Sequence, residues 1–470
     1  MNKMVVDPGS FRDPKGQVFL DGEKVYRVIR AGGKKDFEFV QSTGLLAALA
    51  DKGQIVGSSI VSNTVLDDYS KPDGIVIEHD KIPFISYPYE WSFSFLKSAA
   101  LLHLDIHLQA LEVGVTLSDA SAYNVQFRGS TPVFIDILSF RKLRKGETWE
   151  GHRQFCEQFL NPLLLRAKID LIPNAWYRGT QEGISTPDLN RILPWYKKTS
   201  WNMLTQVVAQ SALQNVSLNS TASAAEKIEY PLSAYKKMLT KMRDWIQVLV
   251  PAKATKTEWQ EYSTQHSYQD AEQLAKTKFV AEFTRSIKPK ILWDIGCNTG
   301  DYSKIALENG AEFSIGFDFD QGALDKGYAR AIKEGLAFQP LFLDGANPSP
   351  SQGWNETERR SLSQRKNADA IVALAFIHHI AIGRNIPLEN VIRWLVSLAP
   401  EGVIEFVPKN DPMVRQLLKL REDIFDEYSE ETFRNFLTRH ADIVKMEKIT
   451  EAGRVLYWFK RNSDGSNSKA

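Results

Sequence analysis

The sequence predicts two domains, a mixed α+β domain followed by an α/β domain with a mostly parallel sheet. The chain has 470 residues, whereas one hydrophobic core seldom serves more than about 250–300 residues. From Ile291 to Val407, short apolar runs alternate with helix-length segments, which is typical of βαβ units. The first half lacks this alternation, so we expect the two halves to fold separately.

In the first half, the apolar pattern predicts one hairpin and three helices. An Asp-Gly turn joins Val18–Leu20 to Val25–Ile29 in the predicted hairpin. Helical periodicity covers Phe37–Lys52, Trp91–Glu112 and Leu232–Leu249. The third helix ends near a proline, and we place the domain boundary just after it, at residues 251–256.

In the second half, five apolar runs predict the strands of the sheet. They are Ile291–Ile295, Phe313–Phe317, Pro340–Leu343, Ala370–Ala375 and Val403–Val407. Two polar stretches are expected to lie outside regular structure: Gln214–Lys227 as a surface loop and Pro348–Asn367 as an insertion in the α/β pattern. Residues 463–470 are expected to form a flexible tail.

Composition excludes several classes of protein. The 43% hydrophobic and 24% charged residues argue against a disordered chain. Lys and Arg (58) nearly balance Asp and Glu (57), so no bulk basic field favours nucleic acid or an anionic membrane. The two cysteines, Cys156 and Cys297, cannot form a disulfide framework. Without a long apolar segment or an apolar signal core, we expect a cytoplasmic protein with no membrane insertion and no nucleic-acid partner.

The segment ILWDIGCNTGDYS, residues 291–303, predicts a ligand-binding turn. A buried strand carries Asp294 near its end, and Gly296 and Gly300 then lead into a helix. Glycines without Cβ atoms let a ligand approach the backbone, and the start of the helix offers unpaired N–H groups.

The next two strands also end in acidic residues. Asp318, followed closely by Asp320, ends the second strand, and Asp344 ends the third. Ligands of open α/β sheets bind at the carboxyl edge, where an acidic residue can hydrogen-bond to ribose hydroxyls. A side chain at the position of Asp344 can reach an adenine amine. The pattern therefore predicts an adenosine-containing ligand, and the alternative is a glycine turn in a domain that binds no nucleotide.

A dinucleotide site fits this turn poorly. The G-x-G-x-x-G motif is absent, and Asn298 stands near the place of its middle glycine. The acidic residue before Gly296 would repel a pyrophosphate but would favour a cationic amino acid. The segment resembles Rossmann-like class I S-adenosylmethionine-dependent methyltransferases over about Trp259–Lys460. The resemblance implies that Asp294, Gly296 and Gly300 lie at the methionine end, Asp318 at the ribose and Asp344 at the adenine. Asn298 and Asp320 are further candidates for cofactor binding.

Two histidines follow the fourth strand and face the expected acceptor position. His378 and His379 are candidates for a general base, because an imidazole titrates near neutral pH. The alternative is that one of them packs against the end of the strand. Glu405 and Lys409, at the end of the fifth strand, are further candidates, but a solvated or structural role is favoured for both.

The segment GVTLSDASAYNVQFRGSTPVFIDILSF, residues 114–140, contains a second constellation. Asp119 and Asn124 are followed by Asp136 within an apolar run predicted to be a strand. This spacing resembles the catalytic loop and metal-binding aspartate of protein-kinase-like folds, which implies a small lobe at about 1–88 and a helical lobe at about 89–250. By this resemblance Asp119 orients a hydroxyl nucleophile, and Asn124 and Asp136 hold Mg²⁺ of Mg-ATP.

The sequence departs from the kinase pattern in several places. Leu117 replaces the usual His, Ile-Leu follows Asp136 instead of Phe-Gly, and the nearest stand-in for a glycine-rich loop is GSFRDPKG, residues 9–16. Lys24, Arg27 or Arg30 would have to supply the cation that a lysine normally provides. A structural alternative stays open, in which Asp119 and Asn124 satisfy a loop and Asp136 hydrogen-bonds to backbone.

Across nearly its whole length, the chain resembles a bacterial family of methyltransferases related to a nodulation host-specificity protein. The segments DPGSFRDPKGQVF, IPFISYPYEW, LSDASAYNVQF, FIDILSF and QFCEQFLNPL carry this resemblance. It implies a kinase-like domain at 1–250, a methyltransferase domain at 256–462, and an oxygen or nitrogen acceptor on a small molecule, glycan or glycoconjugate precursor. A bifunctional kinase–methyltransferase and a non-catalytic scaffold stay open, and the sequence does not indicate the oligomeric state.

Overall fold

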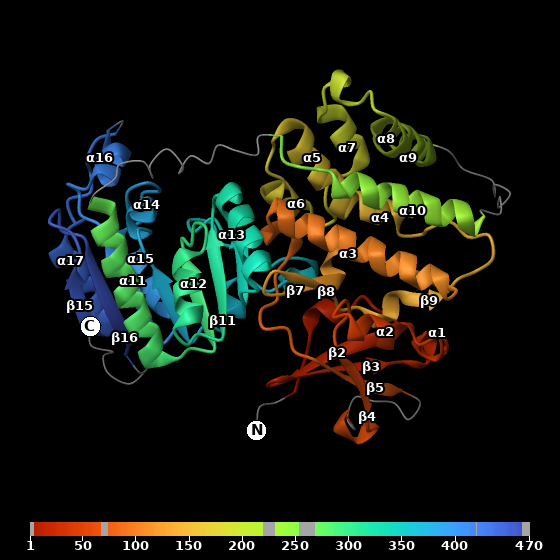
Figure 1. Cartoon of the computed structure of the whole chain (residues 1–470), viewed down its shortest axis with the longest axis horizontal. Helices are drawn as coiled ribbons and strands as arrows, with labels where there is room; N and C mark the ends of the chain where they lie inside the picture. Colours follow the sequence, from red (N-terminus) through yellow and green to blue (C-terminus); the bar gives the residue numbers. More distant parts are fainter. Residues whose placement is uncertain (1–3, 67–73, 220–230, 253–267, 420, 463–470) are drawn as a thin grey trace. The chain divides into compact units, whose positions relative to one another are not determined.

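The computed structural model describes residues 4–66, 74–219, 231–252, 268–419 and 421–462 (Figure 1). The chain divides into a first unit, Met1–Ala254 with Ser351–Arg359, and a second unit, Thr255–Pro350 with Arg360–Ala470. Most of the expected boundary at 251–256 and all of the expected tail at 463–470 lie outside the described residues. Among the described helices, none is both long and apolar enough to cross a membrane.

The first unit begins with a five-stranded antiparallel sheet in the order β1-β2-β3-β5-β4. Its strands are β1 (Val5–Val6), β2 (Gly16–Asp21), β3 (Lys24–Ile29), β4 (Ser58–Val61) and β5 (Ile75–His79). The predicted hairpin is β2–β3, paired in register around the Asp-Gly turn. Between β3 and β4, the single helix predicted at Phe37–Lys52 is two helices, α1 (Ala31–Ser42) and α2 (Leu45–Asp51). The helix breaks because Gly44 adopts a left-handed φ of 74°.

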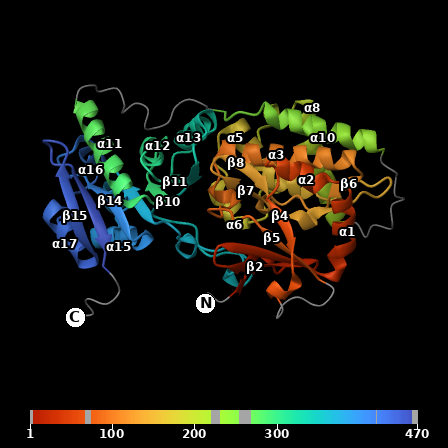
Figure 2. The same cartoon turned by 60° about the horizontal axis from the view of Figure 1, so that its bottom comes forward.

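The rest of the first unit is mainly helical. The predicted helices at 91–112 and 232–249 correspond to α3 (Phe93–Glu112) and α10 (Leu232–Gln247), which lie side by side in Figures 1 and 2. They are joined by an ion pair of 2.5 Å between Arg243 and Asp105. The other helices are α4 (His152–Phe155), α5 (Asn161–Ile169), α6 (Asn174–Thr180), α7 (Thr186–Ile192), α8 (Trp201–Met203) and α9 (Gln210–Asn219). The expected loop at 214–227 is therefore wrong for its first six residues, which continue α9, and the remainder lies outside the described residues.

Two short two-stranded sheets follow α3 and carry the second constellation. β6 (Val115–Leu117) pairs with β9 (Phe140–Lys142), and β7 (Val125–Arg128) pairs with β8 (Thr131–Phe134). Asp136 was expected inside a strand, but β8 ends two residues earlier. Asp136 instead caps a 3-10 turn at Ile137–Ser139, because its carboxylate accepts the Leu138 N–H.

The second unit contains a seven-stranded sheet in the order β12-β11-β10-β13-β14-β16-β15. The first five strands are parallel, and β16 runs antiparallel to both neighbours. Their bounds are β10 (Ile291–Ile295), β11 (Phe313–Asp318), β12 (Phe338–Phe342), β13 (Ala370–Ala373), β14 (Glu401–Phe406), β15 (Ala441–Lys448) and β16 (Val455–Arg461). The five predicted strands match β10 to β14, so the Rossmann-like arrangement expected for this half is present.

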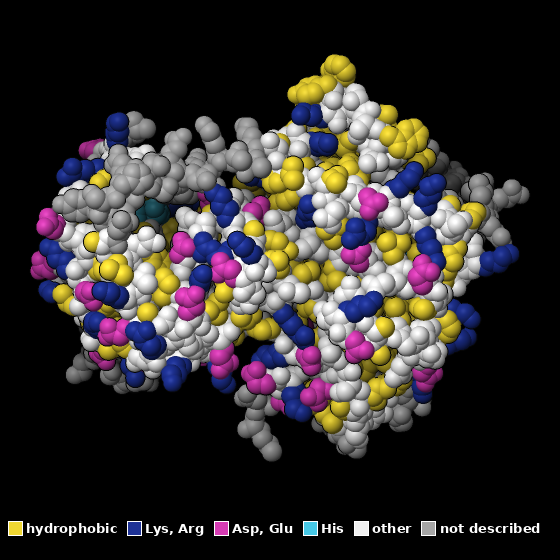
Figure 3. Space-filling model, viewed as in Figure 1, with side chains coloured by type: hydrophobic (Ala, Val, Ile, Leu, Met, Phe, Trp, Pro, Cys, Tyr) yellow, Lys and Arg dark blue, Asp and Glu magenta, His cyan; other side chains and the backbone are white. Residues whose placement is uncertain are grey.

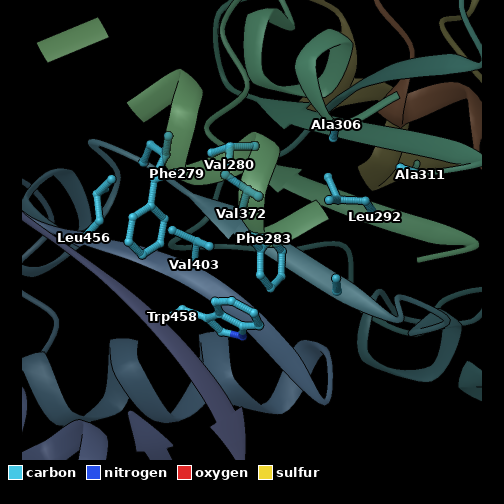
Figure 4. Close-up of a cluster of buried hydrophobic side chains, with 12 residues drawn as sticks. Phe279, Val280, Phe283, Leu292, Ala306, Ala311, Val372, Val403, Leu456 and Trp458 are labelled. Carbon is cyan, nitrogen blue, oxygen red and sulfur yellow. The ribbon is translucent and has the colours of Figure 1, made fainter. Parts of the chain in front are cut away.

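Helices cover both faces of this sheet. α11 (Tyr268–Ile287), α12 (Asp301–Glu308) and α13 (Gln321–Glu334) lie on one face, and α15 (Leu388–Leu398) and α17 (Glu430–His440) on the other (Figures 1 and 2). Figure 4 shows Phe283 of α11 against Trp458 of β16, with ring centroids 5.3 Å apart, inside the apolar layer between α11 and the strands. Basic and acidic side chains are interspersed over the face of each unit drawn in Figure 3.

The insertion expected at Pro348–Asn367 lies between β12 and β13. Its residues 351–359 belong to the first unit, although the flanking residues belong to the second. Gln352 and Arg359 exchange two backbone hydrogen bonds of 2.9 Å, which makes this segment a small hairpin.

Candidate functional site

The turn between β10 and α12 has the backbone geometry that its glycines permit. Gly296 and Gly300 both have φ of 81°, a left-handed conformation that other residues rarely adopt. A Cβ at Gly300 would also lie 2.5 Å from the ring of Phe338. Asn298 has φ of 51°, and its N–H donates to Asp318 Oδ2 at 2.7 Å. The turn is therefore fixed against the end of β11.

Asp294 lies beneath this turn. Its side chain is 2% exposed, and the Ser303 hydroxyl on α12 donates to its Oδ2 at 2.7 Å. Burial raises the pKa of Asp294 to about 7, because the charged form loses its hydration. Asp294 is therefore buried beneath the turn, and its carboxyl group is held by the Ser303 hydroxyl on α12.

Asp318 and Asp344 lie at the same edge of the sheet, because β10, β11 and β12 are parallel neighbours. Asp318 also accepts the Asp320 N–H at 2.8 Å, and burial raises its pKa. Asp344 accepts the Ala346 N–H at 3.1 Å and pairs with the half-exposed Arg384 at 2.5 Å. The structure thus brings the three predicted strand-end carboxylates together at one edge.

Of the two residues that follow Asp318, Asp320 is held in a helix cap, whereas Phe319 is exposed. Asp320 caps α13, where its Oδ1 accepts two backbone N–H groups at 2.8 and 3.1 Å. Phe319 is 59% exposed, and its ring centroid lies 5.4 Å from that of Phe342. An exposed aromatic ring next to a strand-end acid offers a face for a purine. Phe319 was not predicted from the sequence, although an aromatic residue between two acids was a visible signal.

The two histidines lie on α14 (Ile377–Ala381). His378 is 1% exposed, and no described atom hydrogen-bonds to either of its ring nitrogens. Its ring centroid lies 4.1 Å from that of the partly exposed His379. Burial lowers the pKa of both side chains, to about 4 for His379. Both rings are therefore neutral at physiological pH, and His379 is the more accessible of the two.

A buried ionic cluster lies next to the histidines at the ends of β13 and β14. Glu405 is fully buried, accepts the Ala375 N–H at 2.7 Å, and pairs with Lys276 at 3.0 Å and with Arg454 at 3.2 Å. Arg454 also lowers the pKa of His379 through its charge. Glu272 and Asp411 complete the cluster, at 2.8 and 2.7 Å from Arg454. Lys409, the other weak candidate, instead pairs with the exposed Asp423 at 2.8 Å.

In the first unit, the second constellation converges. Asn124 Nδ2 donates to Asp119 Oδ2 at 3.1 Å, and the Ser139 hydroxyl donates to Asp136 Oδ2 at 2.5 Å. Asn124 Nδ2 lies 3.4 Å from the Ser139 hydroxyl, which links the two pairs. The guanidinium of Arg27, on β3, lies 2.6 Å from Asp136 Oδ1. Of the three basic residues that sequence reasoning offered, Arg27 is the one that pairs with Asp136.

Comparisons with known proteins bear on the family of the chain. No family model matches it. Nodulation protein NoeA of Rhizobium meliloti (strain 1021) is 43% identical over 459 residues, which cover 97% of this chain and 96% of that protein. The chain belongs to the NoeA family. That name does not specify a reaction.

The similarity between this chain and solved structures is much weaker. Magnesium protoporphyrin IX methyltransferase of Synechocystis PCC 6803, with bound SAM, is 17% identical over 43% of this chain and 89% of its own, with a TM-score of 0.30. N-methyltransferase NodS of Bradyrhizobium japonicum WM9, with SAH, is 11% identical over 45% and 95%, with a TM-score of 0.33. WbdD is 16% identical over 43% and 42%, with a TM-score of 0.29. Scores of this size do not establish a reaction.

Two glutamine side chains hold the loop at 119–124 by accepting hydrogen bonds from its backbone. Neither glutamine was predicted from the sequence. Gln154 Oε1 accepts the Ala120 N–H at 2.9 Å, and Gln158 Oε1 accepts the Ala122 N–H at 2.8 Å. Gln158 lies in a π-helical stretch, Cys156–Leu160, that joins α4 to α5. Polar residues are frequent along 152–158, so no local signal distinguished these two glutamines. Over the described residues, no three His, Cys, Asp or Glu side chains are arranged to hold a metal ion.

Proposed function

We propose that the chain is an S-adenosylmethionine-dependent methyltransferase that acts on an oxygen or nitrogen acceptor. The observation that carries this proposal is the convergence of Asp294, Asp318 and Asp344 with the Gly296–Gly300 turn at one edge of the sheet. Ligands of open α/β sheets bind outside the carboxyl ends of the strands.

The residues at this edge fit the methyl donor. Its amino-acid end is cationic at the amine and the sulfonium. A cation near the turn would favour the ionised form of Asp294, whose pKa burial raises to about 7. A dinucleotide would instead place its pyrophosphate against that carboxylate, which is unfavourable. The exposed ring of Phe319 suits the flat adenine, next to Asp318 for the ribose hydroxyls. These acidic, glycine and aromatic groups support a site for an adenosine sulfonium at this edge.

S-adenosylmethionine supplies a methyl group that its sulfonium already activates for transfer. The chain's own contribution is therefore to position the acceptor, exclude water and take up a proton. His379 is neutral and partly exposed, so its ring can accept a hydrogen bond from the hydroxyl or free amine of an acceptor. Because its pKa is lowered to about 4, it takes up the proton only as methyl transfer turns that group into a strong acid. The ring of His378 lies against that of His379, with centroids 4.1 Å apart. The buried cluster around Glu405 holds the backbone N–H of Ala375, just before α14, and so fixes the start of that helix.

The acceptor is proposed to be a glycan, a glycoconjugate precursor or another small molecule. This part of the proposal rests on membership of the NoeA family alone. A methyl acceptor of this kind presents hydroxyl or amine nucleophiles, which can donate a hydrogen bond to the neutral ring of His379.

The experiment that tests methyl transfer uses the full chain with S-adenosylmethionine labelled in its methyl group. Glycan and small-molecule fractions from bacterial cells serve as acceptors, with Asp318→Asn as the impaired variant and Asp442→Asn, exposed on β15, as the control. We expect labelled product from the wild type and the control and at least a tenfold loss in Asp318→Asn, because one lost charged hydrogen bond costs about 1.5–3 kcal/mol. Equal labelling with all three proteins would contradict the assigned site.

A second candidate function is Mg-ATP binding in the first unit, in a kinase-like arrangement. The specific observation in its favour is the convergence of Asp119, Asn124 and Asp136 with Arg27 on β3. Kinase-like sites place a cation on the third strand and a metal on the Asn and the second Asp. Because Arg27 already neutralises Asp136, Mg²⁺ would have to replace this pair.

Calorimetry with ATP, with and without Mg²⁺, tests the second candidate. Saturable binding that needs Mg²⁺ and is lost in Asp136→Asn would support a bifunctional kinase–methyltransferase. Absence of binding in a protein that still takes up S-adenosylmethionine would leave the first unit as a recognition module or scaffold.

A further inference from the structure

The hairpin at 351–359 belongs by sequence to the α/β half but packs in the first unit. Its two strands are closed by the paired backbone hydrogen bonds of Gln352 and Arg359. Just outside it, the Leu362 N–H donates to the Ser349 carbonyl at 2.9 Å, which pins the base of the insertion within the second unit. In Figure 2 the hairpin is the teal segment beside β2.

The main contact of the hairpin is a two-point ion pair. Arg12 Nε and Nη2 donate to the two carboxylate oxygens of Glu358 at 2.7 and 3.0 Å. The Glu358 side chain is 3% exposed, and its Oε2 also accepts the Trp354 N–H at 3.0 Å. A buried carboxylate is costly unless it is paired, so this contact specifies how the hairpin docks. Arg12 lies in the connection between β1 and β2.

The next residue of the hairpin contacts Tyr123, in the loop of the second constellation. The Arg359 guanidinium lies 4.1 Å from the ring centroid of Tyr123, which stands between Asp119 and Asn124 in sequence. A Cβ added to Gly9 would lie 3.1 Å from Arg359 Nη1, so the β1–β2 connection approaches closely there. At the start of the hairpin, Gln352 Nε2 donates to the Arg178 carbonyl at 2.8 Å.

We propose that these contacts form a latch, in which a docking surface of the first unit binds the chain's own hairpin and closes the Asp119–Asn124 loop to incoming molecules. The surface consists of Arg12, Tyr123 and the Arg178 carbonyl. The hairpin supplies the Glu358 carboxylate, which accepts two hydrogen bonds from Arg12, and the Arg359 guanidinium, which lies over the ring of Tyr123. Because the hairpin lies between β12 and β13 in sequence, the chain connects the latch to the second unit at both ends. The latch goes beyond methyl transfer and does not rest on it.

Hydroxyl-radical footprinting of the full chain tests the latch directly, with the oxidation rate of Tyr123 as the readout. Glu358→Gln removes the charge that holds the hairpin. Glu356→Gln is the matched control, because it makes the same change at an exposed position of the same hairpin. We expect Tyr123 to be oxidised several-fold faster in Glu358→Gln and at the wild-type rate in Glu356→Gln. Equal rates in all three proteins would overturn the proposal.

Hydrogen exchange provides a second readout and a second variant. Arg12→Gln changes a side chain that is 60% exposed, so the fold should tolerate it. Amides of 352 and 359 should exchange about tenfold faster in both Arg12→Gln and Glu358→Gln, which corresponds to about 1.4 kcal/mol. The charge-exchanged pair Arg12→Glu with Glu358→Arg should restore protection.

Two results would overturn the latch: unchanged exchange in the single variants, or faster exchange with unchanged oxidation of Tyr123. S-adenosylhomocysteine binding is measured on the same samples. It should be equal in all variants, so that failure of the latch and failure of the proposed methyltransferase site are separate outcomes.

Discussion

Replacing Asp294 by Asn should change how the stability of the protein depends on pH. Asp294 is 2% exposed, its carboxylate accepts a hydrogen bond from the Ser303 hydroxyl, and burial raises its pKa to about 7. The asparagine keeps the size and an acceptor for Ser303 but has no charge. The difference between the two proteins therefore isolates the cost of ionising a carboxyl group inside the second unit.

The sign follows from proton linkage. In the unfolded chain Asp294 ionises near the ordinary aspartate pKa of 3.8, whereas in the folded chain it holds its proton to about pH 7. The folded state thus binds more protons between these values, and the contribution of Asp294 to stability, present below pH 3.8, is lost as the pH rises to 7. The free energy of unfolding of the wild type therefore falls by roughly 4 kcal/mol at most over this pH range. Asp294→Asn has no carboxyl group at this position, so its stability lacks this decrease.

Urea unfolding at several pH values between 4 and 8 measures this difference. We expect the free energy of unfolding of Asp294→Asn, relative to wild type, to rise with pH and to level off above pH 7. Asp442→Asn, exposed on β15, should show no such trend. A difference independent of pH would refute the reasoning, because it would mean that Asp294 ionises alike in the folded and unfolded chains.

Three further predictions concern the same unit. Gly300→Ala should lower the free energy of unfolding by about 2–4 kcal/mol in urea, because it strains a φ of 81° and meets Phe338; a loss below about 0.5 kcal/mol would contradict the turn geometry. Phe319→Ala should leave stability unchanged but weaken S-adenosylhomocysteine binding about tenfold by calorimetry, as expected for a lost aromatic–base contact; unchanged affinity would remove Phe319 from the site. Glu405→Gln should cost about 3 kcal/mol in urea, because it leaves Arg454 and Lys276 short of a buried partner; a neutral effect would mean that the cluster does not stabilise the fold.

Local patterns were sufficient for the elements that position the proposed cofactor site. The strands from β10 to β14 could be predicted because each is a short apolar run between breakers, and the Gly296–Gly300 turn because only glycine suits its backbone. The edge shared by Asp294, Asp318 and Asp344 followed from the parallel order of the strands. Each of these inferences needed only residues that are near in sequence or the general rule for parallel sheets.

The remaining features depend on contacts between distant residues. The pairing of Arg27 with Asp136 spans 109 positions, and that of Arg12 with Glu358 spans 346, so no local pattern indicates either. The insertion at 348–367 could be predicted from its polarity, but its membership of the first unit could not. The prediction of a single helix at 37–52 was wrong for a different reason. Its apolar periodicity continues across Gly44, but that glycine adopts a left-handed conformation and ends the first helix.

Equilibrium binding of S-adenosylmethionine to the full chain tests the central claim most directly. Calorimetry at neutral pH, with S-adenosylhomocysteine and NAD as comparison ligands, separates the methyl-donor site from a dinucleotide site. We predict saturable binding of one molecule of either adenosine sulfur compound per chain, weakened in Asp318→Asn, and no binding of NAD. Binding of NAD that Asp318→Asn weakens, or no binding of S-adenosylmethionine by a folded protein, would contradict the account.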